Sequence, residues 1–332
     1  MPGITSDVPR PAVPATTSSP TPRTALNRLV FRAFGTQCEV RYQPAPAGSA
    51  ARFESAVRAW VENFDARYSR FRPDSIVSRI NAAAGRNWTE IDREMEDLLD
   101  VCASVYSLTG GILDATAGPL LRLWDDGQKP AHLAPGAAQI AAARILACWH
   151  LVQRQPGRIF LPKVGMSLDL GGWGKEWAVD AIAQLAVRHG VLHVLVDFDQ
   201  AIRSIGAPPD GPAWPVAPGY FAAAESPGGT LALPADRGLA STGNHARLLA
   251  GGTVCAGPMV DPRTGRPAAH GCRQVTVIAD TCFQAGLLSA TAFVLGAEAG
   301  LTFIQQFPRA EALIVSASGR VETPGFRRHV AG

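Results

Sequence analysis

A glycine-rich segment, LDLGGWGKEWAVD at residues 168–180, combines residue types that can bind an anion. Adjacent glycines allow backbone N–H groups to approach an anion closely, and Lys175 adds a positive charge where a helix is expected to begin. The spacing matches neither a Walker loop nor the fingerprint of a Rossmann nucleotide-binding fold. The segment therefore predicts either a phosphate site of another kind or an ordinary joint between a strand and a helix.

Two further segments place polar side chains in loops. In TGGILDATAGPLLRLW, residues 109–124, the carboxylate of Asp114 could accept hydrogen bonds from a ligand or form a local Asx turn. In ASTGNHAR, residues 240–247, the hydroxyls of Ser241 and Thr242 could line a binding loop together with Asn244.

The remaining polar residues of interest lie in a predicted turn or stand alone. The segment VDPRTGRP, residues 260–267, has the Asp-Pro and glycine pattern of a turn. His270 stands alone, and a lone histidine is more often structural than catalytic. No nucleophile elbow and no paired metal-ligand spacing occurs in the sequence.

Composition indicates a globular protein. The chain has 332 residues, of which 47% are hydrophobic and 18% charged, so it can bury a large core. Its net charge is only +3, and no basic run exceeds Arg327–Arg328, which argues against a nucleic-acid surface. No apolar stretch is long enough for a membrane span. The sequence therefore predicts neither nucleic acid nor membrane as a partner.

The cysteines and the N-terminal residues indicate the compartment. Six cysteines occur without any C-x-x-C pair, and we expect them to be buried and reduced. Residues 1–26 are rich in Pro, Ser and Thr and lack the apolar core of a signal peptide or a lipoprotein motif. We therefore expect a disordered tail over residues 1–26, a domain over residues 27–332 and a cytoplasmic location.

Helical and strand patterns mix without regular alternation, which predicts the α+β class. The glycines at 110 and 111 are expected to end a helix capped by Thr89, and Ser75 is expected to cap another. A loop is expected over 112–127 and a hairpin over 158–170. Other predicted helices cover residues 53–64, 134–146, 175–189 and 284–296. Predicted strands cover 29–42 (two strands around Gly35–Thr36), 191–198, 273–279 and 311–318.

Six segments, taken in order, resemble the FAD:protein FMN transferases, the ApbE-type flavin transferases. They are YSRFRPDSIVSRIN, TGGILDATAGPLLRLW, LDLGGWGKEWAVDAIAQLAVRHGV, ASTGNHAR, VDPRTGRP and VTVIADTCFQAGLLSATAFVLG, and the resemblance covers about residues 29–325. It implies a single α+β domain related to the T-fold, with an FAD site in a cleft. Members use Mg²⁺ to split the FAD pyrophosphate, transfer FMN to a Thr or Ser hydroxyl of a target flavoprotein and release AMP.

The resemblance also implies site residues. Phe34 and Phe71 match positions that offer a surface to a ring, and both keep an apolar side chain. Gly172 matches a position that offers a ligand to the metal. The residues implied to bind FAD are Phe34, Phe71, Ile112, Leu113, Asp114, Asp169 and Lys175.

Several positions depart from the family pattern on the metal and phosphate side. The two residues expected to bind the metal from a late helix are Gly286 and Ala290, which carry no ligand atom, and only Ser289 between them has a hydroxyl. Two glycines of the family become Asp199 and Gln200.

A further departure is Pro258, which stands where the family has a histidine. The resemblance predicts the family activity, FMN transfer from FAD to a protein hydroxyl, and three hypotheses are compared. The first is a working transferase in which, for example, Asp197 or Asp199 reaches the metal. The second is a catalytically weak or inactive relative that binds a flavin nucleotide or serves as an accessory protein. The third is a structural module that binds no flavin.

Overall fold

The computed structural model describes residues 26–43, 49–124, 135–217, 230–243, 246–249, 252–255 and 259–330. Nearly all of the predicted N-terminal tail lies outside these residues, as do Asn244 and Pro258. The architecture is of the α+β class, as the sequence predicts.

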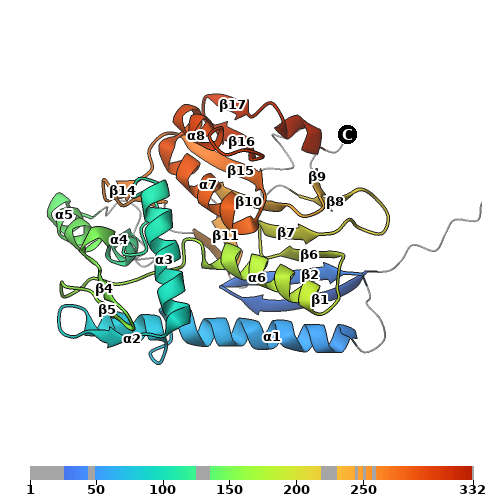
Figure 1. Ribbon diagram of the computed structural model, residues 1–332. Helices are drawn as coiled ribbons and strands as arrows, with labels where there is room; N and C mark the ends of the chain where they lie inside the picture. The colour runs from blue at the N-terminus through green and yellow to red at the C-terminus, as the bar shows by residue number, and fades with distance from the viewer. Residues whose placement is uncertain are drawn as a thin grey trace, which may run out of the picture.

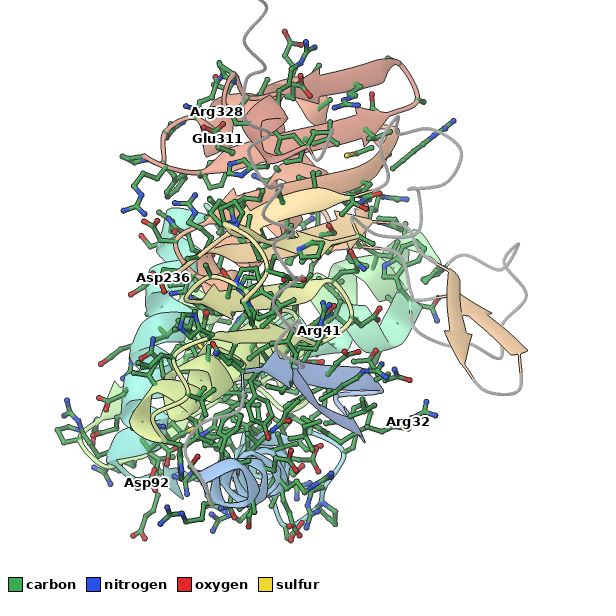
Figure 2. All side chains as sticks on the ribbon, turned by 90° about the vertical axis from the view of Figure 1, so that its right-hand side faces the viewer. Arg32, Arg41, Asp92, Asp236, Glu311 and Arg328 are labelled. Carbon is green, nitrogen blue, oxygen red and sulfur yellow. The ribbon has the colours of Figure 1, made fainter. Side chains whose placement is uncertain are left out.

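An antiparallel sheet of eight strands forms the centre of the molecule. Figure 1 shows its strands side by side, and Figure 2 shows them stacked from β1 and β2 near the bottom to β17 at the top, with Glu311 beside Arg328 at the upper end. The strands, in spatial order, are β1 (Asn27–Ala33), β2 (Thr36–Tyr42), β6 (Val194–Asp197), β7 (Ala201–Ile205), β10 (Gly238–Gly243), β15 (Cys272–Ala279), β16 (Glu311–Ser316) and β17 (Gly319–Glu322).

Helices cover one face of this sheet. Helix α6 (Gly174–Arg188) packs on β6 and β7, α7 (Cys282–Leu295) on β10 and β15, and α8 (Ala297–Ile304) on β16. Helix α1 (Ser49–Tyr68) packs against α6 and lies along the lower side in Figure 1.

Alternating side chains on the strands separate the two faces of the sheet. Val194 and Val196 join the core beneath α1 and α6, whereas Leu195 joins the core on the opposite face. That opposite face is covered by β8 (Ala213–Val216), β9 (Leu231–Pro234) and the short helix η2 (Phe326–His329).

A smaller part packs beside the sheet and has its own core. Buried Met95, Leu99, Ile159 and Leu168 belong to this core. The elements that build this core are α2 (Ile76–Ala83), β3 (Thr89–Glu90), α3 (Arg93–Leu108), η1 (Trp149–Leu151), β4 (Gln153–Gln155) and β5 (Arg158–Phe160). Helix α4 (Gly118–Trp124) packs against α5 (Ala137–Leu146) and β13 (Val260–Asp261), and β13 pairs with β14 (Arg266–Pro267). A separate hairpin joins β11 (Ala246–Leu249) to β12 (Gly252–Cys255).

Most predicted elements are present, with three corrections. The cap of α3 is Asp92, whose side chain accepts from Met95 N, because Thr89 is occupied in a strand pair with Ile159. The expected loop over 112–127 contains α4. The expected hairpin over 158–170 lies earlier, because β5 pairs with β4. The cap at Ser75 is confirmed by its 2.9 Å hydrogen bond from Ser78 N.

The five cysteines whose side chains are described are free, and four of them are buried as predicted, whereas Cys148 is half-buried. Burial raises the pKa of Cys38 and of Cys102 to about 12 and that of Cys272 to about 11. These three thiols are therefore protonated at neutral pH and are poor nucleophiles. Among the described helices, none has the length and apolar character needed to cross a membrane.

The corrected cap of α3 can be tested by a pair of substitutions. Asp92→Ala removes the acceptor for Met95 N and should lower the free energy of unfolding by about 1 kcal/mol. The matched control Thr89→Ala removes a hydroxyl that does not cap the helix, and it should cost less than half as much. Urea unfolding followed by circular dichroism measures both, and an equal loss in the two variants would contradict the assignment.

Candidate functional site

The start of α6 is held against the start of α7 by aromatic and polar contacts. The rings of Trp173 and Trp177 each meet the ring of Phe283 edge to face, with centroids 5.5 Å apart. One turn further along α6, the carboxylate of Asp180 accepts from the N–H groups of Cys282 and Phe283 at 3.0 and 2.8 Å. This carboxylate satisfies two donors at the N-terminus of α7, so the two helices cannot slide freely past each other.

The turn between β6 and β7 has a backbone conformation that favours glycine. Asp199 and Gln200 have φ angles of 51° and 73°, in the left-handed region. The two residues that stand where the family pattern has glycines therefore adopt a backbone conformation that is uncommon for residues with a side chain. Lys175 Nζ donates to the carbonyl of Asp199 at 2.9 Å, and Ser241 N donates to the carbonyl of Gln200 at 3.1 Å.

The end of β10 is tied to the middle of α7. The hydroxyls of Thr242 and Ser289 form a hydrogen bond of 2.9 Å, and Ser289 Oγ lies 3.1 Å from the carbonyl of Gly286. Gly286 in turn faces the side chain of Glu176. Glu176 lies on α6 directly after Lys175, so the set of contacts closes at the helix where it began. We call this closed set of contacts among Lys175, Asp199, Gln200, Ser241, Thr242, Ser289, Gly286 and Glu176 the Lys175 network.

The two hypothetical replacement carboxylates lie at the same turn. Asp197 accepts a hydrogen bond from the backbone of Gln200, and burial raises its pKa against the lowering effect of Arg41. Gln200 Oε1 is buried without a hydrogen-bond partner, so one acceptor oxygen here is unsatisfied among the described residues. The turn thus holds oxygen atoms beside Lys175, and Asp197 is already engaged within it.

A second set of contacts presents an exposed aromatic ring. Phe71 is 77% exposed, and the guanidinium of Arg70 lies over its ring at 4.0 Å from the centroid. Arg70 Nε also pairs with buried Asp169 at 2.9 Å, and the other oxygen of Asp169 accepts from Gly171 N at 2.8 Å. Because Asp169 N donates to the carbonyl of Ala115 at 2.7 Å, this set also fixes the loop that contains Asp114.

Asp114 forms the local Asx turn rather than projecting a free carboxylate. Its Oδ1 accepts from Thr116 N at 2.7 Å and from the Thr116 hydroxyl at 2.6 Å, and its Oδ2 accepts from Trp149 N at 3.2 Å. The neighbouring Ile112 is buried and Leu113 is half-buried against the smaller core. All three therefore hold the loop in place.

Phe34 connects the first hairpin to the turn at Asp199. Its φ of 52° is left-handed, and its ring stacks on that of Phe198 at 5.8 Å between centroids and also meets Phe64 at 5.8 Å. A surface cavity of about 380 Å³ lies beside this hairpin and is lined partly by Phe31 and Phe34. Phe34 thus lies next to the Lys175 network through Phe198.

The structure brings five of the predicted site positions into these two sets. Lys175, Gly286 and Ser289 belong to the Lys175 network, and Phe71 and Asp169 belong to the set around Arg70. Gly172 is exposed between them at the start of α6, and Ala290 is buried in α7. Sequence reasoning missed Arg70 and Glu176. Arg70 stands inside a quoted segment, but only its contact with Asp169 reveals its role.

The structure also places the predicted turn at Asp261 and the lone His270. The turn at Asp261 is confirmed, since Gly265 N donates to the Asp261 carbonyl at 2.7 Å, and Gly265 has a φ of 70°. The carbonyl of Gly265 accepts from the indole of Trp124 at 2.9 Å, which joins this turn to the segment that contains Asp114. His270 is exposed and lies against Gly296.

The buried carboxyl of Asp114 should make stability depend on pH. Burial raises its pKa above the ordinary 3.8, despite the hydrogen bonds from Thr116 and Trp149. A raised folded-state pKa stabilises the fold fully below the unfolded pKa, and this contribution is lost as pH rises through the folded value. The unfolding free energy of the wild type relative to Asp114→Asn should therefore fall as the pH rises above the ordinary carboxyl pKa of 3.8 and through the raised folded-state pKa. Urea titrations of both proteins measure this difference, and a flat difference would contradict the burial of the carboxyl.

Comparison with known proteins gives consistent matches. The model of the ApbE family matches residues 34–314. The chain is 28% identical over 324 residues to an FAD:protein FMN transferase of Klebsiella pneumoniae, covering 95% of this chain and 93% of that protein. It is 28% identical over 308 residues to the FAD:protein FMN transferase of Treponema pallidum, covering 86% of this chain and 83% of that protein.

Solved structures agree in fold. The flavin transferase ApbE from Vibrio cholerae superimposes with a TM-score of 0.77 at 22% identity, covering 92% of this chain and 99% of that one. The ApbE protein from Thermotoga maritima gives a TM-score of 0.79 at 24% identity, covering 92% and 100%. Since the family model spans most of the sequence, this chain belongs to the ApbE family.

Proposed function

We propose that this protein is an FAD:protein FMN transferase, which transfers FMN from FAD to a Thr or Ser hydroxyl of a target flavoprotein and releases AMP. Membership of the ApbE family supports the activity, as do relatives that carry this name. The observation that carries the proposal is the Lys175 network, in which a cationic side chain, a helix start and several hydroxyls come together.

The proposed FAD contacts come from both the Lys175 network and the set of contacts around Arg70. The exposed ring of Phe71 offers a face on which an aromatic ring system can stack, and Phe34 offers a second apolar surface. Lys175 adds positive charge for the pyrophosphate. Asp169, Ile112, Leu113 and Asp114 position the loops that line the site, since their polar atoms and side chains are engaged within the protein.

The reaction is a phosphoryl transfer. The acceptor hydroxyl attacks the phosphorus of the FMN half, a new phosphoester P–O bond forms, and the pyrophosphate P–O bond to AMP breaks. The hydroxyl proton is released, and AMP departs with the electrons of the broken bond. Lys175 would offset the negative charge that develops on the phosphate oxygens.

Bound Mg²⁺ would supply further charge neutralisation on the pyrophosphate. The hydroxyl of Ser289 and the backbone at Gly172 are the proposed ligands, and oxygen donors of this kind suit Mg²⁺. Gly286 and Ala290 offer no side-chain ligand. No group of three His, Cys, Asp or Glu side chains suited to a metal occurs within the described ranges. Among the described residues the proposed protein donor set is therefore small, and phosphate oxygens of the substrate would complete it.

The domain boundaries and the compartment also belong to this proposal. Family matches begin close to the first strand, which supports a catalytic domain over residues 27–332 preceded by a tail over 1–26. The cytoplasmic location stays a prediction from the sequence.

A direct assay tests the activity. With FAD, Mg²⁺ and a peptide that carries an acceptor Thr, the protein should release AMP and increase the peptide mass by one FMN, because transfer couples the two events. A matched peptide with Val in place of that Thr should remain unmodified. FAD binding without AMP release or transfer would favour the inactive flavin-binding relative, and no FAD binding would favour the structural module.

The ring surface can be tested apart from turnover. Phe71→Ala should raise the Kd for FAD about fivefold, because ring stacking contributes about 1 kcal/mol. Phe71→Tyr keeps the ring and should bind FAD as the wild type does. Leu192→Ala, at another exposed apolar position, is the surface control. Flavin fluorescence titration measures the three Kd values, and an unchanged Kd for Phe71→Ala would contradict the role.

A further inference from the structure

The side chain of Glu176 occupies the space over Gly286. A Cβ atom added to Gly286 would lie 2.6 Å from Cγ, 3.2 Å from Cδ and 3.3 Å from Cβ of Glu176. These are the three nearest atoms to that Cβ position, and the shortest distance is below any ordinary contact. A carboxylate from α6 therefore stands where a side chain at position 286 of α7 would otherwise project.

This arrangement is fixed by the packing of the two helices. Trp173, Trp177 and Phe283 lock the first turn of α6 onto α7, and Asp180 binds the N–H groups of Cys282 and Phe283. Moving one turn back along α6 leads from Asp180 to Glu176, and moving one turn forward along α7 leads from Cys282 to Gly286. The helices are thus locally antiparallel, and Glu176 meets Gly286 as a consequence.

The surroundings of this carboxylate supply other hard oxygen donors. Ser289 Oγ bonds both Thr242 Oγ1 and the carbonyl of Gly286, so two hydroxyls and a carbonyl lie on the same stretch of α7 and β10. Glu176 is half-buried beside Lys175, whose ammonium is directed to the Asp199 carbonyl. One carboxylate with a few neutral oxygens is the kind of protein donor set that Mg²⁺ takes when phosphates complete its shell.

We infer that Glu176 supplies the metal-binding carboxylate of this site, in place of a side chain at position 286. The inference rests on the proposed function for its role in the reaction, but metal binding can be measured without turnover. The alternative is a structural role, in which the negative charge of Glu176 stabilises α6 by its interaction with the helix dipole. Loss of such a role would leave the metal affinity unchanged.

Exchange of the two positions provides the sharpest test. Glu176→Gln keeps the shape and removes the charge, so Mn²⁺ should bind at least about tenfold more weakly, the lower end of what loss of an outer-shell partner costs. Gly286→Asp alone should not strengthen binding, because its Cβ collides with Glu176. The double variant Glu176→Gly with Gly286→Asp returns one carboxylate to the same space, and its Mn²⁺ affinity should come within about threefold of the wild type.

The readout is Mn²⁺ titration followed by electron paramagnetic resonance, with ADP present as a pyrophosphate that contains no FMN. Glu298→Gln, at an exposed position on α8, is the control for loss of a distant charge and should bind as the wild type does. Thermal melts by circular dichroism confirm folding. If Glu176→Gln does not fold, Glu176→Asp and the double variant decide, since the first should weaken binding and the second restore it.

The outcomes separate this inference from the proposed activity. Mn²⁺ binding that depends on Glu176, without FMN transfer by the wild type, would support the metal ligand and refute the transferase. Transfer that requires Mg²⁺, with Mn²⁺ affinity unchanged in Glu176→Gln, would support the transferase and overturn the ligand. No Mn²⁺ binding by the wild type, or no restoration in a folded double variant, would also overturn it.

Discussion

The contact between the first two turns of α6 and the start of α7 is the constraint on which the site depends. Asp180 satisfies two N–H donors of α7, and the three aromatic rings at Trp173, Trp177 and Phe283 fill the space beside it. An unsatisfied helix end or a void here would cost more than any single contact of the site contributes. Because this contact fixes α6 against α7, Lys175 and Glu176 have defined neighbours.

The contact between α6 and α7 also explains why residues from distant parts of the chain meet. Lys175 reaches the turn after β6, and the same turn binds β10 through Ser241. β10 returns to α7 through Thr242 and Ser289. The turn after β6, strand β10 and helix α7 are all held by the central sheet, so the Lys175 network is supported by a rigid framework. Its hydrogen bonds are shared among elements that the apolar core already places.

Much of the fold and part of the site could be predicted from the sequence. The spacing of apolar residues predicted α1 and α3, and Ser75 was recognisable as a cap because its chemistry is local. The cap of α3 was misassigned because Thr89 pairs with Ile159 in a small sheet, and that strand pairing is not local. The loop predicted over 112–127 failed for a similar reason, since α4 is stabilised by packing against α5 and β13.

Local chemistry is what the sequence determined by itself. It fixed the family, the α+β class, the glycine-rich start of α6 and the absence of ligand atoms at Gly286 and Ala290. Only the tertiary structure decided which side chains face one another. Asp114 forms its own turn, Arg70 joins Phe71 to Asp169, and Glu176 covers Gly286. The physical reason is that a sequence specifies what each position can donate or accept, whereas the partner is chosen by how two packed helices and a sheet bring remote positions within a few ångströms.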